Sequence, residues 1–88
     1  MASYAIEFKR SAERDLRKIS PALIPAILSR VEALAEDPFP RQSRKLAGAE
    51  RIYRLRVGVY RVVYEVDSDL RAITIHYIRH RREAYRQA

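Results

Sequence analysis

The segment RLRVGVYRVVYEV, residues 54–66, constrains the fold more than any other part of the chain. Apolar and charged residues alternate on both sides of Gly58 and Val59, and a period of two is typical of β-strands. A glycine in the first central position favours a two-residue type II′ turn. The segment therefore predicts a β-hairpin in which Arg56 lies opposite Arg61, so that two like charges face each other.

This register divides the hairpin side chains between two faces, because successive side chains of a strand point to opposite sides. The face expected to enter the core carries Tyr53, Leu55, Val57, Tyr60, Val62, Tyr64 and Val66. The other face carries Ile52, Arg54, Arg56, Arg61, Val63 and Glu65. Like charges directly opposite each other cost up to about 1 kcal/mol, whereas a phosphate gains from several guanidinium groups. We expect this face to bind an anion. The alternatives are arginines that spread into water, or a slipped register.

The N-terminal half predicts one strand and two helices. Apolar residues alternate over residues 4–8, and helical spacing follows Ser11, which we expect to cap the first helix. A second apolar stripe runs over residues 24–35, and Pro25 must then lie near the start of that helix.

A basic loop, residues 41–51, leads into three strand-like runs near residues 52–57, 60–66 and 72–78. The predicted order is β-α-α-β-β-β in a single α+β domain spanning residues 1–88. Two N-terminal helices pack on a largely antiparallel four-stranded sheet, and a short C-terminal tail or helix follows.

Basic charge is concentrated in the second half of the chain, whose net charge is +7. Residues 1–40 hold six basic and six acidic side chains, whereas residues 41–61 hold seven basic and one acidic. Such a region is typical of a protein with a phosphate-rich partner such as nucleic acid; the alternative is a solvated basic surface. The chain has no cysteine, which fits a reducing cytoplasm, and no apolar run long enough to span a membrane. We expect a cytoplasmic protein without membrane contact.

The two histidines have different surroundings. By alternation His76 shares a face with Thr74 and Ile78, and we predict a structural, hydrogen-bonded histidine. His80 lies among arginines, where a neutral imidazole could accept a proton; the alternative is a solvated residue in a tail. Tyr85 could stack on a base, supply a phenolic oxygen or anchor the C-terminus. Two histidines without clustered carboxylates make a poor metal site, and two glycines make no phosphate loop, so no metal or cofactor is expected.

Three motifs, KLAG at 45–48, YRLRVGVYRVVYEV at 53–66 and HRREAYR at 80–86, resemble the RelE/ParE superfamily of bacterial type II toxin–antitoxin toxins. The resemblance covers essentially the whole chain. RelE-type toxins cut messenger RNA in the decoding site of the 30S ribosomal subunit, and ParE-type toxins inhibit DNA gyrase. The HRREAY motif favours the RelE-like branch. A gyrase inhibitor without nuclease activity and an inactive basic binding module are the alternatives.

The resemblance implies site residues and a chemistry without a metal. Its catalytic residues map to Arg61, Arg81 and Tyr85, and its basic strand position maps to Arg54, with Arg56 beside it. We expect Lys45 and Arg44 of the basic loop to bind RNA phosphates as well. A ribose 2′-oxygen attacks the adjacent phosphate, giving a 2′,3′-cyclic phosphate and a free 5′-hydroxyl. Arg61 stabilises charge on the phosphate, Tyr85 acts as general base or stacking platform, and Arg81 stabilises or protonates the leaving oxygen. Proton donation by His80 is our own hypothesis.

The resemblance also implies which partners the chain meets. These are messenger RNA, the ribosome and a cognate antitoxin that neutralises the basic surface. DNA would be met only indirectly, through the antitoxin complex. RelE itself has lysines at two positions that are Ile52 and Arg54 here.

Overall fold

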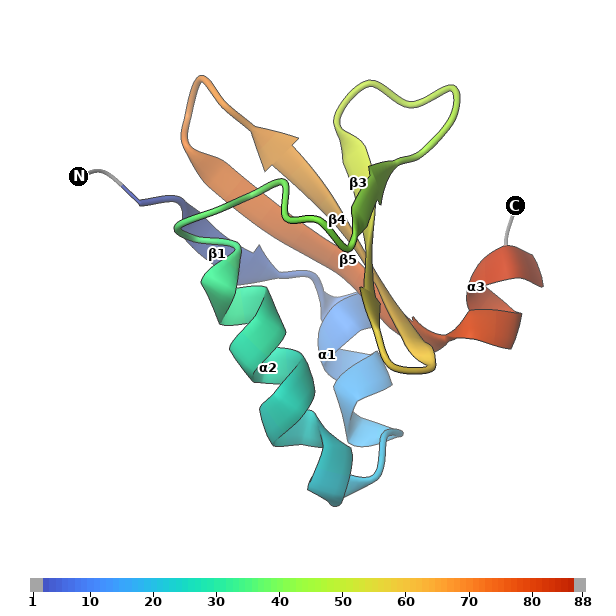
Figure 1. The fold of residues 1–88 in the computed structure, drawn as a ribbon. Helices are drawn as coiled ribbons and strands as arrows, with labels where there is room; N and C mark the ends of the chain where they lie inside the picture. The colour runs from blue at the N-terminus through green and yellow to red at the C-terminus, as the bar shows by residue number, and fades with distance from the viewer. Residues whose placement is uncertain (1–2, 87–88) are drawn as a thin grey trace.

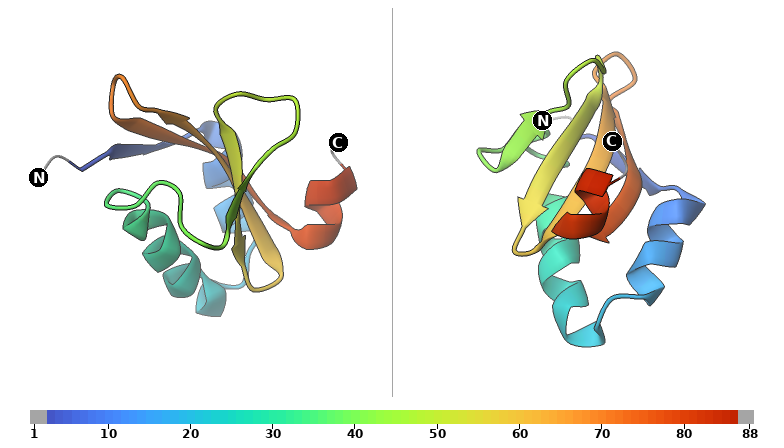
Figure 2. Two further views of the ribbon diagram at one scale, coloured as in Figure 1. Left: turned by 45° about the horizontal axis from the view of Figure 1, so that its top comes forward. Right: turned by 90° about the vertical axis from the view of Figure 1, so that its right-hand side faces the viewer.

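In residues 3–86, which the computed structural model describes with side chains as far as Glu83, five strands form one sheet of order β1-β5-β4-β3-β2. The elements are β1 (Ala5–Phe8), α1 (Arg10–Arg17), the 3-10 turn η1 (Pro21–Leu23), α2 (Ile24–Ala33), β2 (Ser43–Lys45), β3 (Ile52–Val57), β4 (Tyr60–Asp67), β5 (Ala72–His80) and α3 (Arg81–Arg86). Helices α1 and α2 lie on one side of the sheet, and α3 lies on the other (Figure 1 and Figure 2).

The α+β class is confirmed, but the sheet differs from the predicted one in two ways. β2 lies in the segment predicted to be a loop and pairs antiparallel with β3. Its three polar residues show no apolar alternation, and a short edge strand needs none. β1 pairs parallel with β5, a pairing that requires a long connection between the two strands. The sheet is therefore mixed and five-stranded rather than antiparallel and four-stranded.

The helices follow the predicted pattern apart from one cap. α2 carries Pro25 in its first turn, as expected. α1 begins at Arg10 with Lys9 in the N-cap position, so the prediction that Ser11 caps this helix is wrong. The Ser11 hydroxyl instead donates a hydrogen bond to the main-chain carbonyl of His76. Within residues 3–86, none of the helices has the length and apolar character needed to cross a membrane.

Beyond the end of β1, helix α1 and the residue before it supply hydrogen-bond partners for the edge of β5. The Lys9 N–H donates to the Ile75 carbonyl over 2.9 Å. Further along, the Ile78 N–H donates to a carboxylate oxygen of Asp15 over 3.0 Å. An open sheet edge leaves backbone groups without partners. These two bonds give partners to backbone groups of this edge and hold the second half of β5 in place. That half of the strand carries part of the site described below.

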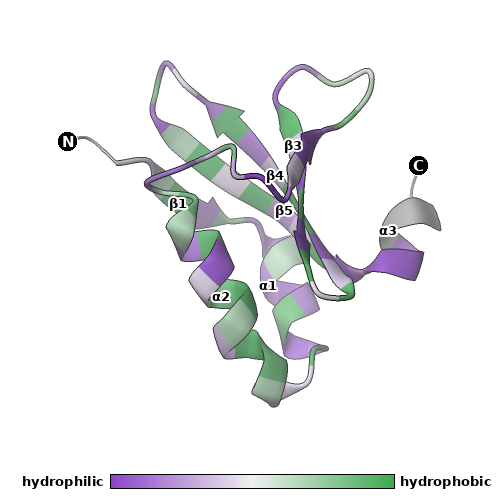
Figure 3. Cartoon of the chain, viewed as in Figure 1, coloured by the Kyte–Doolittle hydropathy of each residue, from purple (hydrophilic) through white to green (hydrophobic). Residues whose placement is uncertain are grey.

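The core lies between α1, α2 and the sheet face that they cover, hereafter the helix-covered face. Its buried side chains are Ala12, Ile19, Ile27, Val31, Leu34, Leu55, Val62, Tyr64, Val66, Ile73, Ile75 and Ile78. Tyr53, Val57 and Tyr60 pack against this cluster, so the predicted core face of the hairpin is confirmed. The alternation of apolar and polar residues along the strands is visible in Figure 3.

Tyr64 is the largest fully buried side chain, and its hydroxyl anchors the chain after α2. The hydroxyl donates to the Pro38 carbonyl over 2.7 Å. Burial raises the pKa of Tyr64 to about 12, because the phenolate would lose its hydration. The anchored segment leads directly into β2.

β5 contains one extra residue relative to β4. Val63 pairs with Tyr77, but the next residue, Tyr64, pairs with Ile75. His76 is the residue left over, and such a bulge shifts the alternation of the strand. The prediction that His76 shares a face with Ile78 is therefore wrong, since Ile78 enters the core.

Candidate functional site

The β3–β4 hairpin has the register predicted from the sequence. Arg56 pairs with Arg61, and the two strands meet at Gly58 and Val59. Gly58 has a φ of +59°, whereas Val59 is not among the described residues with positive φ. A positive φ at the first central position alone is that of a type II′ turn. The turn therefore fixes the two arginines opposite each other.

The pairing continues into β5 and places a third arginine beside the first two. Arg61 pairs with Arg56 on one side and with Arg79 on the other. Neighbouring strands lie about 4.8 Å apart, so the three residues form a row across the sheet, hereafter the arginine row. The row and Arg54 share the sheet face turned away from α1 and α2, hereafter the arginine face. Arg79 was not among the predicted site residues. The bulge at His76 changes the face on which the later residues of β5 lie, and the sequence does not reveal this bulge.

Arg61, the central residue of the row, is only 7% exposed. Its Nη1 donates to the Gly58 carbonyl over 3.1 Å and to the Tyr60 carbonyl over 3.0 Å. These carbonyls belong to the hairpin turn, so the turn that pairs the strands also orients the guanidinium. A buried, oriented guanidinium is preorganised to bind an oxyanion.

The ends of the arginine row differ in their electrostatic surroundings. Arg56 is exposed. Arg79 is half-buried, and its Nε lies 3.5 Å from a carboxylate oxygen of Asp15. One of the three positive charges is thus partly balanced by an acidic side chain of α1.

The predicted phosphate-binding residues of β2 are divided between the two faces. Arg44 pairs with Arg54 and lies on the arginine face. Its Nη1 donates to the carbonyls of Arg41 and Ser43, over 3.0 and 2.9 Å. Lys45 pairs with Tyr53, whose side chain packs on the core. By alternation the structure does not bring Lys45 together with Arg44.

The predicted residues of the C-terminal segment are also divided. His80 pairs with Tyr60, and their rings meet edge-on at 5.8 Å between centroids. Since Tyr60 packs on the core, His80 lies on the helix-covered side and not beside Arg61. Arg81 is exposed at the start of α3, and its N–H donates to the Val59 carbonyl over 2.7 Å. This bond joins α3 to the turn that orients Arg61. The side chain of Tyr85 lies outside the described residues.

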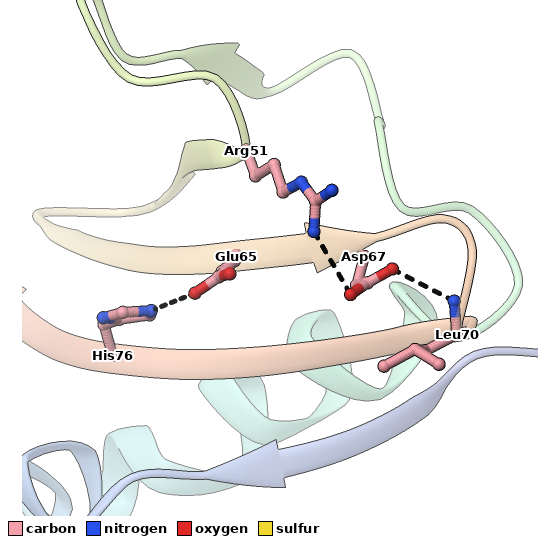
Figure 4. Close-up of polar contacts among 5 residues, drawn as sticks. All are labelled: Arg51, Glu65, Asp67, Leu70 and His76. Atoms are coloured by element: carbon pink, nitrogen blue, oxygen red, sulfur yellow. Dashed lines mark hydrogen bonds and ion pairs between the residues drawn. The ribbon is translucent and has the colours of Figure 1, made fainter.

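The end of the sheet next to the β4–β5 turn carries acidic side chains in polar contacts (Figure 4). A carboxylate oxygen of Glu65 lies 3.1 Å from Nε2 of His76. The prediction of a hydrogen-bonded His76 is thus confirmed. Asp67 forms an ion pair with Arg51 at 3.2 Å and accepts from the Leu70 N–H over 3.0 Å. The arginine face is therefore basic near the hairpin turn, whereas towards the opposite end the carboxylates of Glu65 and Asp67 contact His76 and Arg51.

The described part of the chain offers no group of three histidine, cysteine or acidic side chains able to hold a metal ion.

Residues 6–85 match the model of a family described as the ParE toxin of the type II toxin-antitoxin system parDE. Toxin RelG of Mycobacterium tuberculosis is 31% identical over an alignment of 91 positions, gaps included, which covers 96% of this chain and 98% of RelG. The RelBE2 toxin-antitoxin complex of M. tuberculosis contains a chain with a TM-score of 0.79 and 26% identity, covering 89% of this chain and 98% of that one. A chain of the archaeal RelE-RelB complex of Pyrococcus horikoshii OT3 has a TM-score of 0.79 and 27% identity, covering 90% of this chain and 96% of that one. The similarity thus extends over sequence and fold.

Proposed function

This chain belongs to the RelE/ParE superfamily of type II toxin–antitoxin toxins, and we propose that it is an endoribonuclease that cleaves messenger RNA on the ribosome. The arginine row carries this proposal. Three guanidinium-bearing residues lie side by side on one sheet face, although like charges in neighbouring positions disfavour folding. The central one is held by the hairpin turn. A phosphate group relieves the repulsion and uses the forked donors.

The proposed reaction takes place at one phosphate of the RNA backbone. The ribose 2′-oxygen forms a bond to phosphorus, the bond from phosphorus to the 5′-oxygen breaks, and a 2′,3′-cyclic phosphate remains. Arg61 stabilises the negative charge that develops on the phosphoryl oxygens, a contribution of several kcal/mol for a preorganised donor. Arg54 and Arg56 position the flanking backbone.

Two proton transfers balance this reaction. The 2′-hydroxyl proton passes to a base, for which Tyr85 is our candidate, as the family resemblance implies. The leaving 5′-oxygen gains a proton from Arg81 or, where Arg81 only stabilises its charge, from water. Arg81 is our candidate because its backbone is bonded to the turn beside Arg61. His80 is less well placed for this step, since its ring lies with Tyr60 on the helix-covered side.

We also propose an antitoxin partner. The two related structures described above are complexes of RelE-type toxins with their antitoxins, and this chain carries a net charge of +7. An acidic antitoxin segment over the arginine face would compete with RNA for the same guanidinium groups.

A gyrase inhibitor is the second candidate function, because the matching family model is that of ParE toxins. Such a toxin would use the same fold to bind a protein and would leave messenger RNA intact.

Cleavage of a defined messenger RNA on translating ribosomes separates these candidates. RNA ends are mapped by primer extension for the wild-type protein, for Arg61→Ala, and for Arg14→Ala as control, since Arg14 is an exposed arginine of α1. Wild type and Arg14→Ala should cut alike, and Arg61→Ala should be slower by about 100-fold or more while still folded by circular dichroism. The purified antitoxin should stop cleavage in the same assay.

Two results would contradict the proposal. One is growth arrest by the wild-type protein without new RNA ends. If DNA supercoiling by gyrase is inhibited at the same time, the second candidate function replaces the first. The other is unreduced cleavage by folded Arg61→Ala, which would remove Arg61 from the site.

A further inference from the structure

Tyr77 is an aromatic residue of the arginine face to which the proposed reaction gives no role. Its ring lies 4.4 Å from the guanidinium carbon of Arg79 and meets the ring of His76 edge-on, at 6.4 Å between centroids. Each neighbour is held by a carboxylate, Arg79 by Asp15 and His76 by Glu65. Tyr77 is thus fixed by two side chains that are themselves fixed. A ring that is already ordered loses little conformational entropy when a ligand binds to it.

The surroundings of Tyr77 change in character along the strands. Three cross-strand rows follow one another from the hairpin turn towards the opposite end: Arg56–Arg61–Arg79, then Arg54–Val63–Tyr77, then Ile52–Glu65–Thr74. Residues two apart along a strand are separated by roughly 7 Å. The first row is cationic, the second mixes a cation with apolar surface, and the third carries a carboxylate.

This order of charges determines how a nucleotide would lie. A phosphate is attracted to the first row and repelled by Glu65 in the third. The Glu65 side chain is 38% exposed, and that of Val63 is buried although it belongs to the arginine face. A nucleotide with its phosphate on the arginine row would therefore direct its base across Val63 towards Tyr77 and Glu65.

We propose that Tyr77 and Glu65 form a nucleobase subsite beside the arginine row, an inference that rests on RNA binding as proposed above. The base stacks on the ring of Tyr77 or on the Arg79 guanidinium that covers it, since both surfaces stack on unpaired bases. The Glu65 carboxylate accepts a hydrogen bond from an exocyclic amino group, as acidic residues do from cytosine N4. Cytosine is accepted and uracil is disfavoured, because uracil presents a carbonyl oxygen at the same position.

Equilibrium binding of single-stranded oligoribonucleotides to the full chain tests this subsite without the ribosome. The probes are hexacytidylate, hexauridylate and a hexamer of abasic ribose phosphates, each labelled with a fluorophore and titrated at low salt. Wild type should bind hexacytidylate more tightly than the abasic hexamer by about tenfold or more, the usual effect of one stacked base. It should prefer hexacytidylate over hexauridylate by about fivefold.

Variants of Tyr77 test the stacking of the base, and a variant of Glu65 tests the recognition of its amino group. Tyr77→Ala should remove most of the preference for hexacytidylate over the abasic hexamer, and Tyr77→Phe, which keeps the ring, should retain it. Glu65→Gln should abolish the preference for cytidine over uridine. Affinity of Tyr77→Ala and Tyr77→Phe for the abasic hexamer should stay at the wild-type value, whereas Glu65→Gln, which removes a negative charge, should bind it slightly more tightly at low salt. Circular dichroism shows that each variant is folded.

Equal binding of all three hexamers by wild type would overturn the subsite and leave the phosphate-binding role of the arginine row intact. Equal loss of affinity for the abasic and base-containing hexamers in Tyr77→Ala would also overturn it, since Tyr77 would then act only on the protein or the phosphates. A base preference that persists while Arg61→Ala binds and cleaves like wild type would instead remove the proposed catalytic role of Arg61. Absence of binding to any hexamer would overturn the subsite, and the cleavage assay on translating ribosomes would then decide the proposed function by itself.

Discussion

The two faces of the sheet are built by the same strands and differ in almost every other respect. On the helix-covered face, Leu55, Val62 and Ile75 are fully buried in an apolar core. On the arginine face, the neighbours of these residues along the strands are Arg54, Arg56, Arg61, Val63, Thr74 and His76. The first face gains stability from every contact that it makes. The second places like charges side by side at a small cost in stability, and a bound anion would offset that cost. The comparison indicates that alternate positions of the same strands serve folding on one face and binding on the other.

The largest expected effect is on stability, from the helix-covered face. Ile75→Ala should lower the free energy of unfolding by about 2 to 5 kcal/mol, a large part of the stability of a small domain. The matched control is Thr74→Ala, which alters the next residue on the opposite face and should cost about 0.5 kcal/mol. Urea denaturation with unchanged m-values measures both. Equal losses in the two variants would contradict the division between the faces.

The next effect concerns alkaline pH. The pKa of Tyr64 is raised by burial from 10.0 to about 12, so the folded state favours the neutral phenol. This contribution to stability is complete below pH 10 and is lost as the pH rises from about 10 to 12. It amounts to about 2 to 3 kcal/mol. Denaturation curves across this range should fall less steeply for Tyr64→Phe than for wild type.

The matched control for this pH dependence is Tyr60→Phe, because Tyr60 is only half-buried at the end of the sheet. It should retain the steep fall of the wild-type curve. An equally steep fall in Tyr64→Phe would show that the loss of stability arises elsewhere.

The smallest effect tests the repulsion on the arginine face. Arg56→Ala should raise the free energy of unfolding by a few tenths of a kcal/mol up to about 1 kcal/mol at low salt, and the gain should shrink as salt screens the charges. The same variant should bind single-stranded RNA more weakly, with a shallower dependence on salt. Arg14→Ala serves again as control. A less stable Arg56→Ala that binds RNA like wild type would reverse the assignment of this face.

Much of the fold was predictable because local rules act on neighbouring residues. The alternation on both sides of Gly58 predicted the hairpin, its turn and the pairing of Arg56 with Arg61, all of which the structure confirms. Pro25 predicted where α2 starts. These signals lie within a few residues of each other and need no knowledge of distant parts of the chain.

The predictions were wrong where contacts between distant segments of the chain determine the local structure. β2 forms because β3 offers it an edge, so its own residues carry no strand signal. Ser11 faces the carbonyl of a residue 65 positions away instead of capping its helix. The bulge at His76 is visible only from the pairing of β5 with β4. It changes the phase of everything after it, which placed Arg79 and Tyr77 on the arginine face and His80 on the other.

The sequence by itself determined which residues alternate, and therefore that a basic face and an apolar face lie back to back on one hairpin. Only the tertiary structure decided that the basic face extends across a third strand, is oriented by the hairpin turn and ends at a carboxylate. The physical reason is that alternation is a property of one strand, whereas the phase between strands is set by hydrogen bonds that close only in the folded sheet.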